Sequence, residues 1–371
     1  MAFYLDNAAT TAVLPQAAQA ALAAMTENYG NPSSLHAGGR QARALLEEAR
    51  TQVARALACP SQCVFFTSGG TESINTAIGG AAFKNKHRGR HIVSTAIEHD
   101  AVLNKLTDLK NQGFEVTLVP PERDGSVSLD RLTAAMRPDT VLVTMQGVNN
   151  ETGAILPFAE AAAAYKQINP EGLFHLDGVQ TFLKQPMLLK NIDLASVSAH
   201  KIGGMKGCGA LYVHPGLHLR PLVFGGNQEN GMRSGTEGVP QIAAFAAACA
   251  VRSAGMAQAS AHMASLKARL IEGARALGAV INTPAQSADH IVNLSMCRGR
   301  SEVYIRVLSD RGFYVSGGSA CARGKRSHVL EAMRLDGRNI DAALRVSFCP
   351  ETPAEAVDGF CEALRDAARM F

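Results

Sequence analysis

The stretches His175-Leu-Asp177-Gly-Val-Gln180 and Ser198-Ala-His200-Lys201 decide the fold of this chain. Each follows a short apolar run, residues 172–174 and residues 192–197, that the pattern predicts to be a buried strand. One predicted strand therefore ends at an aspartate and the next at a lysine. Open α/β sheets bind their ligands at the carboxyl ends of parallel strands. The pattern predicts that Asp177 and Lys201 lie together at such an edge.

The rest of the chain predicts the sheet to which these strands belong. From about Pro15 to Val251 predicted strands alternate with predicted helices, which indicates a mostly parallel α/β sheet with right-handed crossovers. The strands are expected at residues 63–66, 91–94, 114–119, 140–145 and 209–213, and the helices at residues 47–57, 72–84 and 101–112. After about Ser253 the pattern changes to α+β, beginning with a long helix at 258–277. We expect a large domain at residues 15–253 and a smaller α+β domain formed by residues 1–14 with 254–371.

Composition excludes several classes of protein. A chain of 371 residues is long enough for two domains, and its formal charge of +4 is spread out, which does not favour a nucleic-acid partner. The first residues lack a signal-peptide pattern, and the longest apolar window, residues 242–251, is too short to span a bilayer. Eight irregularly spaced cysteines indicate free thiols, and none has the spacing of a zinc site. We expect a cytoplasmic protein with no metal and no membrane association.

An aspartate and a lysine at neighbouring strand ends suit the chemistry of pyridoxal 5'-phosphate (PLP). The lysine amine can form a Schiff base with the cofactor's aldehyde, and the carboxylate keeps the pyridine nitrogen protonated so that the ring withdraws electrons. Residues 68–71 join a strand to a helix, so Gly70 and Thr71 would direct backbone N–H groups at the phosphate. Ser198 and His200 would add donors. An ordinary glycine-rich turn is the alternative interpretation of this loop alone.

Two further strands are followed by His99 and Asn150. His99 could lie over a cofactor ring or move protons near neutral pH, although a structural or solvated histidine is the simpler interpretation of it alone. Asn150 could bind the ring hydroxyl. Because all these loops follow predicted strands, we expect them to converge on one crevice.

The chain resembles the cysteine desulfurases, which are PLP-dependent enzymes with the class-V aminotransferase fold (PLP-dependent transferase fold type I). The resemblance extends from Leu5 to about Ser347, and its motifs stand in the family's order. They are residues 5–11, 31–36, 67–73, 97–99, 148–153, 175–180, 198–201 and 233–237.

The resemblance implies a role for each candidate residue. Lys201 would form the internal aldimine, Asp177 would pair with the pyridinium nitrogen and His99 would stack on the ring. Gln180 and Asn150 would contact the ring oxygen. Several residues would hold the phosphate: Gly70, Thr71, Ser198, His200 and, from the second subunit of a homodimer, Thr236. Arg345 would bind the substrate carboxylate in a bidentate pairing, and Asn150 would also contact the substrate.

Cys321 would select the reaction. Glycine and serine residues around it predict an exposed loop, and nearby Arg323 and Lys325 favour the thiolate. By itself this pattern slightly favours a surface thiol among solvated charges. The resemblance implies instead that L-cysteine loses its α-proton to Lys201 and its sulfur to Cys321, which leaves a persulfide and alanine. His99 would handle the proton of the substrate thiol.

Other functions remain open from the sequence. A selenocysteine lyase or a transaminase would use the same fold, although a transaminase has no use for Cys321. A PLP-binding regulatory protein without turnover would need no attacking thiol. Gly317 replaces a serine that is usual in the family, and the loop after Cys321 is shorter than in the housekeeping members. The chain also ends at Phe371, without the tail by which those members dock an iron–sulfur scaffold protein, so the sulfur acceptor stays open.

Overall fold

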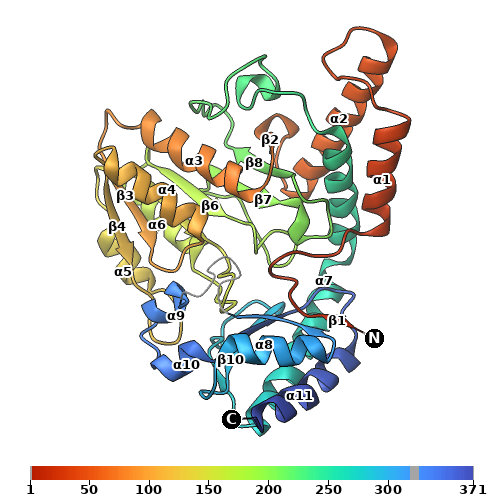
Figure 1. Cartoon of the computed structure of the whole chain (residues 1–371). Coiled ribbons are helices and arrows are strands. Elements are labelled where there is room, and N and C mark those ends of the chain that lie inside the picture. Colours follow the sequence, from red (N-terminus) through yellow and green to blue (C-terminus); the bar gives the residue numbers. More distant parts are fainter. Residues whose placement is uncertain (1, 318–325, 371) are drawn as a thin grey trace.

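A seven-stranded sheet forms the centre of the larger part of the molecule (Figure 1). The computed structural model describes residues 2–317 and 326–370. The strand order is β2-β8-β7-β6-β5-β3-β4, and β8 runs antiparallel to both of its neighbours while the other strands are parallel. The strands are β2 (Val64–Thr67), β3 (His91–Thr95), β4 (Glu115–Val119), β5 (Thr140–Gln146), β6 (Leu173–Asp177), β7 (Leu194–Ser198) and β8 (Gly209–Val213). The predicted mostly parallel sheet is confirmed.

Alternate residues of these strands face two layers of helices. On β3, for example, Ile92 packs with one layer and Val93 with the other, because successive side chains of a strand point to opposite faces. One layer consists of α3 (Gly70–Lys84) and α4 (Asp100–Asn111). The other contains α1 (Pro15–Thr26), α2 (Ala37–Ala56), α5 (Leu129–Ala135), α6 (Phe158–Ile168) and the first half of α7 (Val239–Ala276). The sheet is thus buried on both faces.

A second hydrophobic cluster lies around a smaller antiparallel sheet of order β12-β13-β10-β9. Its strands are β9 (Val280–Ile281), β10 (Ile291–Ser295), β12 (Ser316–Gly317) and β13 (Ala343–Ser347), covered by α8 (Ser301–Asp310) and α11 (Ala354–Ala368). Beside it, β1 (Phe3–Tyr4) pairs in parallel with β11 (Phe313–Tyr314). Two short helices, α9 (His328–Ala332) and α10 (Gly337–Asp341), instead contribute side chains to the core of the large sheet.

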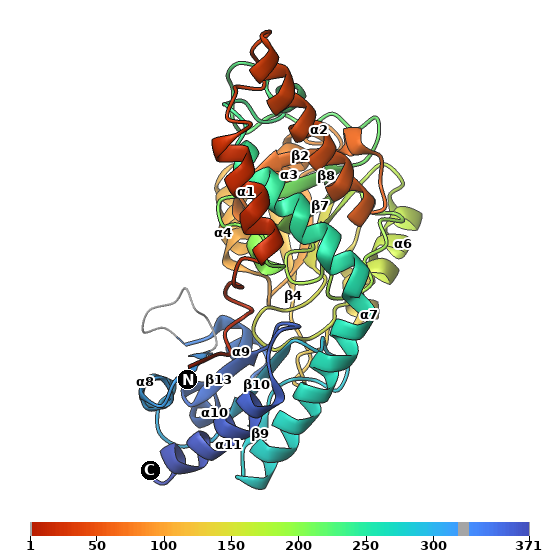
Figure 2. The same ribbon diagram turned by 90° about the vertical axis from the view of Figure 1, so that its right-hand side faces the viewer.

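Helix α7 joins the two parts of the molecule (Figure 2). Its first half packs on α1 and α2, and its second half contacts α11 and the small sheet. The helix that the sequence predicts at 258–277 is the second half of this longer helix, and the apolar window at 242–251 lies in its first half. The boundary expected at residue 253 falls inside it, and the division into two domains stays a prediction. By length and composition α7 could cross a membrane, but Phe245 and Ala248 are fully buried, as in the core helix of a globular protein.

The segment of residues 5–11 crosses from the small sheet to the large one. Asp6 bridges to Ser347 at the end of β13, and the backbone N–H of Thr11 donates to the carbonyl of His200 at 2.9 Å. His200 lies in a short 3-10 turn, Ala199–Lys201, directly after β7. The first residues of the chain are thereby fixed beside the predicted site.

Candidate active site

A cavity of about 300 Å³ lies where the carboxyl ends of the parallel strands face the small sheet. It brings together almost all of the residues that the sequence predicted for a site. These are Gly70, Thr71, His99, Asn150, Asp177, Gln180, Ser198, His200, Lys201 and Arg345. The expected convergence of the strand-end loops on one crevice is therefore confirmed.

Asp177 and Lys201 enter this cavity from neighbouring parallel strands. Asp177 is the last residue of β6, is 5% exposed, and accepts a hydrogen bond from the backbone N–H of Val179 at 3.0 Å. Burial raises the pKa of Asp177, and His99, the Val179 N–H and Lys201 oppose that rise. Lys201 Nζ donates to the carbonyls of Ala8 and Ala9 at 2.6 and 2.8 Å. A cation placed against Asp177 would favour its carboxylate form.

The donors at one end of the cavity fit the phosphate of PLP. Gly70 begins α3, so the positive end of that helix faces this region. A Cβ at Gly70 would lie 2.8 Å from Val179 Cγ2, so the space beside the backbone depends on glycine. Within the described residues Ser198 Oγ is buried and has no hydrogen-bond partner. A buried hydroxyl without a partner is rare, and a phosphate oxygen would supply the missing one.

His200 and His99 have one ring nitrogen each engaged by the protein. His200 Nδ1 contacts Thr10 Oγ1 at 3.1 Å, and burial, followed by Lys201, Lys184 and Lys206, lowers the pKa of His200 to about 4. Its ring is therefore neutral near pH 7. His99 is the N-cap of α4, where its Nδ1 accepts from the N–H of Ala101 at 3.1 Å. This bond fixes the ring at the cavity, and among the described residues no hydrogen bond engages Nε2, which could meet a ligand or a proton.

The buried carboxyl of Glu98, for which the sequence predicted no role, supports the loop at His99. Glu98 is fully buried, and its two oxygens accept from Thr95 Oγ1 at 2.5 Å and from the N–H of Gln146 at 2.8 Å. Burial raises the pKa of Glu98 well above its ordinary value, and nearby Asp177 raises it further. His328, also missed, lines the cavity and donates from Nε2 to the carbonyl of Glu98 at 2.9 Å. The motif at residues 97–99 was visible in the sequence, but its long-range partners were not.

Arg345 and Asn150 lie at the side of the cavity formed by the small sheet. The guanidinium of Arg345, 2% exposed, donates to Asp6 Oδ1 at 2.8 Å and to the carbonyl of Asn150 at 2.9 Å. Within the described residues Arg345 Nε is buried without a partner. The neighbouring Asn149 holds the turn, because its Oδ1 accepts from the N–H groups of Glu151 and Thr152. A carboxylate ligand would have to share Arg345 with Asp6.

Among the described residues, one predicted site residue does not line this cavity. Thr236 is exposed and lines a different, smaller cavity of about 170 Å³ together with Ser68 and Arg233. In one copy of the chain it therefore does not reach Lys201. Cys321 lies outside the described residues.

Comparisons with known proteins agree with this geometry. The family model described as aminotransferase class-V matches residues 3–360. A protein of Methanosarcina thermophila named cysteine desulfurase IscS is 40% identical over 367 residues, covering 97% of this chain and 90% of that protein. A Bacillus subtilis protein named putative cysteine desulfurase IscS 1 is 37% identical over 99% of this chain and 98% of its own length. A solved structure titled NifS-like protein superposes with a TM-score of 0.95 at 38% identity, and all of both chains is covered.

The chain therefore belongs to the class-V aminotransferase family, which has the PLP-dependent transferase fold type I and uses PLP as cofactor. Within that family it falls among the cysteine desulfurases, as the motifs predicted.

Proposed function

We propose that this chain converts L-cysteine to L-alanine and passes the sulfur through Cys321 to an acceptor protein. The observation that supports this most is the meeting of Asp177 and Lys201 in one cavity beside Ser198, whose hydroxyl has no partner among the described residues. The names of the relatives support L-cysteine as the substrate.

The residues of this cavity divide into those that would hold the cofactor and those that would act on the substrate. Bound PLP supplies an electron sink for the electron pair of the substrate's Cα–H bond. Its phosphate would be held by Gly70, Thr71, Ser198 and His200. Asp177 would pair with the ring nitrogen, and Gln180 would donate to the ring oxygen.

Lys201 and His99 would handle the protons. Lys201 would take the α-proton of the substrate, and its amine can lie against the carbonyls of Ala8 and Ala9. His99 Nε2 would receive the proton of the substrate thiol. Arg345 would bind the substrate carboxylate, and Asp6 would then lose part of its ion pair.

The sulfur transfer step would use Cys321 as nucleophile. Its thiolate would form a bond to the substrate sulfur while the substrate's Cβ–S bond breaks and its electrons return to the carbon skeleton. Protonation of that skeleton gives alanine, and the sulfur stays on Cys321 as a persulfide. An acceptor thiol would then take the sulfur for iron–sulfur cluster or other sulfur-containing cofactor biosynthesis. We place this reaction in the cytoplasm, because every cysteine in the described residues is a free thiol.

A homodimer would complete the site. Thr236 is exposed and lies away from the cavity of Lys201, while Phe224 and Leu222 on the preceding loop are 70% and 49% exposed. A second copy packed on this loop would bury both apolar side chains and could bring its Thr236 to the phosphate. We expect light scattering to give twice the mass of the 39.1 kDa chain, and Phe224→Glu to shift the protein toward the monomer. A wild-type monomer with full activity would contradict the shared site.

The function is tested by anaerobic incubation of the PLP-loaded protein with L-cysteine, with and without a thiol reductant. We expect alanine and sulfide in equal amounts when the reductant is present. Cys321→Ser should lose both products, and Cys361→Ser serves as the matched control because Cys361 lies on α11, away from the cavity.

Other outcomes distinguish the rival functions. A keto acid in place of alanine identifies a transaminase. A strong preference for selenocysteine over cysteine identifies a selenocysteine lyase. Binding of PLP without any turnover identifies a regulatory protein. Unchanged activity in Cys321→Ser removes that residue from the reaction.

A further inference from the structure

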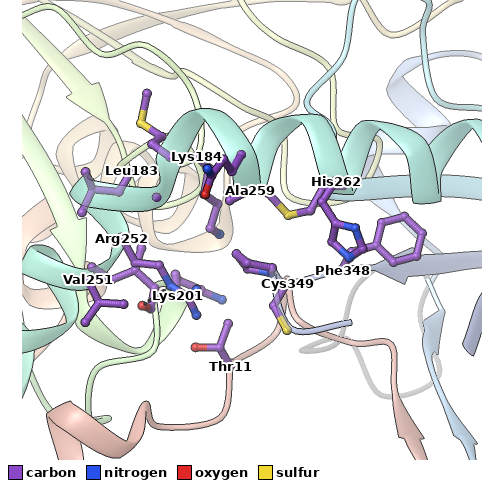
Figure 3. Close-up of a pocket in the computed structure, with 16 residues that line it drawn as sticks. Thr11, Leu183, Lys184, Lys201, Val251, Arg252, Ala259, His262, Phe348 and Cys349 are labelled. Carbon is purple, nitrogen blue, oxygen red and sulfur yellow. Dashed lines mark hydrogen bonds between the residues drawn. The ribbon is translucent and has the colours of Figure 1, made fainter. Parts of the chain in front are cut away.

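Lys201 also lines a second cavity, of about 340 Å³, besides that of the predicted PLP site (Figure 3). Helix α7 forms one wall with Arg252 and His262, and the segment after β13 adds Cys349. Lys184, from the turn after β6, lines it as well. None of the motifs discussed above gives Lys184 a role, although it lies within the protein beside the cofactor lysine.

Lys184 connects this second cavity to Gln180. Its Nζ donates to Gln180 Oε1 at 3.0 Å, and the Nε2 of His290 contacts the same oxygen at 3.3 Å. On its other side the Gln180 amide donates from Nε2 to the carbonyl of Ala8 at 2.8 Å. Gln180 is 4% exposed and His290 is 1% exposed, so water competes little with these bonds.

These partners allow only one orientation of the Gln180 amide. A backbone carbonyl can only accept, so the atom that faces Ala8 must be the nitrogen. That leaves the oxygen facing Lys184, and a lysine amine can donate to it in either of its protonation states. Among the described residues Ala8 is the hydrogen-bond partner of Nε2, which has two hydrogens. The second hydrogen is left for an atom in the PLP cavity, which Gln180 lines.

We propose that Lys184 is a positioning residue that fixes the amide of Gln180 so that its N–H donates to the ring oxygen of bound PLP. This inference rests on the proposed placement of the cofactor against Gln180. It assigns to Lys184 an effect on the cofactor that is transmitted through one side chain. Lys184 itself would touch neither the cofactor nor the substrate.

The surroundings of Lys184 suit such a role. Burial lowers the pKa of Lys184 well below its ordinary value, as do Lys201 and Arg252, while Cys349 opposes the shift. His290, whose pKa burial also lowers well below its ordinary value, is a neutral donor to the same oxygen. The amine is therefore kept in place by its bond to Gln180 without a carboxylate partner among the described residues. Placing a partly buried amine here costs stability, and the orientation of Gln180 is a benefit that methionine could not provide.

The test is a pH titration of the visible absorbance of bound PLP in Lys184→Met. An N–H donated to the ring oxygen favours its anionic form, so loss of the oriented donor should raise the midpoint for loss of the cofactor's proton. We expect a rise of about one pH unit, a tenfold change in proton affinity. Titration of the apoprotein with PLP should show binding weakened about tenfold.

Three further variants make the test specific. Lys184→Arg should keep the wild-type midpoint, because it retains a donor and the adjacent cavity has room for the longer side chain. Lys267→Met is the matched control, since Lys267 is a partly buried lysine that bonds Ser287 and Ala288 instead of the site. In a Gln180→Ala background, Lys184→Met should cause no further shift, because the two residues act as one unit.

Each result has a distinct meaning. An equal shift in both backgrounds would mean that Lys184 acts directly through its charge, which would overturn the inference, as would no shift in either. If wild-type protein bound no PLP at all, the proposed function would fail instead.

Discussion

At Gly70 a single methyl group decides whether the phosphate end of the cavity stays open. A Cβ there would overlap Val179 Cγ2 at 2.8 Å and approach Ser198 Cβ at 3.7 Å. Overpacking of this kind costs about 1–3 kcal/mol, so we expect Gly70→Ala to bind PLP about tenfold more weakly. Titration of the apoprotein with PLP measures this.

A second substitution should reverse the loss of affinity in Gly70→Ala. Gly70→Ala combined with Val179→Ala should recover most of the affinity, because the overlapping methyl is gone. Gly255→Ala on α7, where a Cβ meets nothing within 4 Å, should bind PLP like the wild type. Wild-type affinity in Gly70→Ala alone would contradict the proposed phosphate position.

The sequence predicted which residues form the site better than it predicted the groups to which those residues hydrogen-bond. Asp177 and Lys201 were recognisable because strand ends and their polar residues are local patterns. The acceptors of Lys201 are the carbonyls of Ala8 and Ala9, and backbone groups leave no trace in the residue type. The unpartnered hydroxyl of Ser198 and the buried Glu98 likewise depend on contacts far along the chain.

Among the elements, the central strands are linked by a buried histidine. His175 of β6 contacts Thr144 Oγ1 of β5 at 2.8 Å and Ser196 Oγ of β7 at 3.0 Å. Burial lowers the pKa of His175 to about 3, so the folded protein keeps it neutral. Its contribution to stability is complete above the ordinary value of 6.5 and is lost as the pH falls from 6.5 toward 3.

This linkage can be measured by urea unfolding at several pH values. Between pH 6 and 4, we expect the contribution of His175 to fall by about 1.4 kcal/mol per pH unit. In His175→Gln that part of the dependence should disappear, although the variant is less stable near pH 7. Parallel curves for the two proteins would show that His175 does not titrate in this way.

Helices were harder to delimit than strands. The sequence predicts a helix at 47–57, whereas α2 begins at Ala37, because Gly38 and Gly39 in its first turn resemble a loop. The true start is marked by His36, whose ring accepts from the N–H of Gly39 at 3.3 Å. Conversely, β8 could have been recognised as antiparallel. Residues 199–208 are too short for the crossover that a parallel strand requires.

At the scale of the whole molecule, Arg252 ties α7 to both parts. Its Nε donates to the carbonyl of Ile202 beside the cofactor lysine, and its two terminal nitrogens bind Glu351 at 2.7 and 3.0 Å. Arg252 is 9% exposed. We expect Arg252→Met to lower the free energy of unfolding by about 2 kcal/mol, mainly because the carbonyl of Ile202 loses a charged donor, while the half-exposed Glu351 can be solvated.

A second arginine on α7 provides the control for Arg252→Met. Arg269 pairs with Asp358 in a similar two-pronged way, but both side chains are exposed. Exposed pairs contribute about 0–1 kcal/mol, so Arg269→Met should change the urea midpoint little. Equal losses in the two variants would mean that burial does not set the strength of the Arg252 contacts.

The path of residues 5–11 also determines when the contacts around the site can form during synthesis of the chain. Asn7 Nδ2 donates to the carbonyl of Ser347, a partner 340 positions later in the chain. A ribosome that adds 5–20 residues per second needs roughly 20 to 70 s to make that partner. Until then the segment that carries the carbonyls of Ala8 and Ala9 has only its contacts with the large sheet, such as that of Thr11 with His200. The nascent chain therefore finishes its reactive centre last, after the large sheet has already emerged.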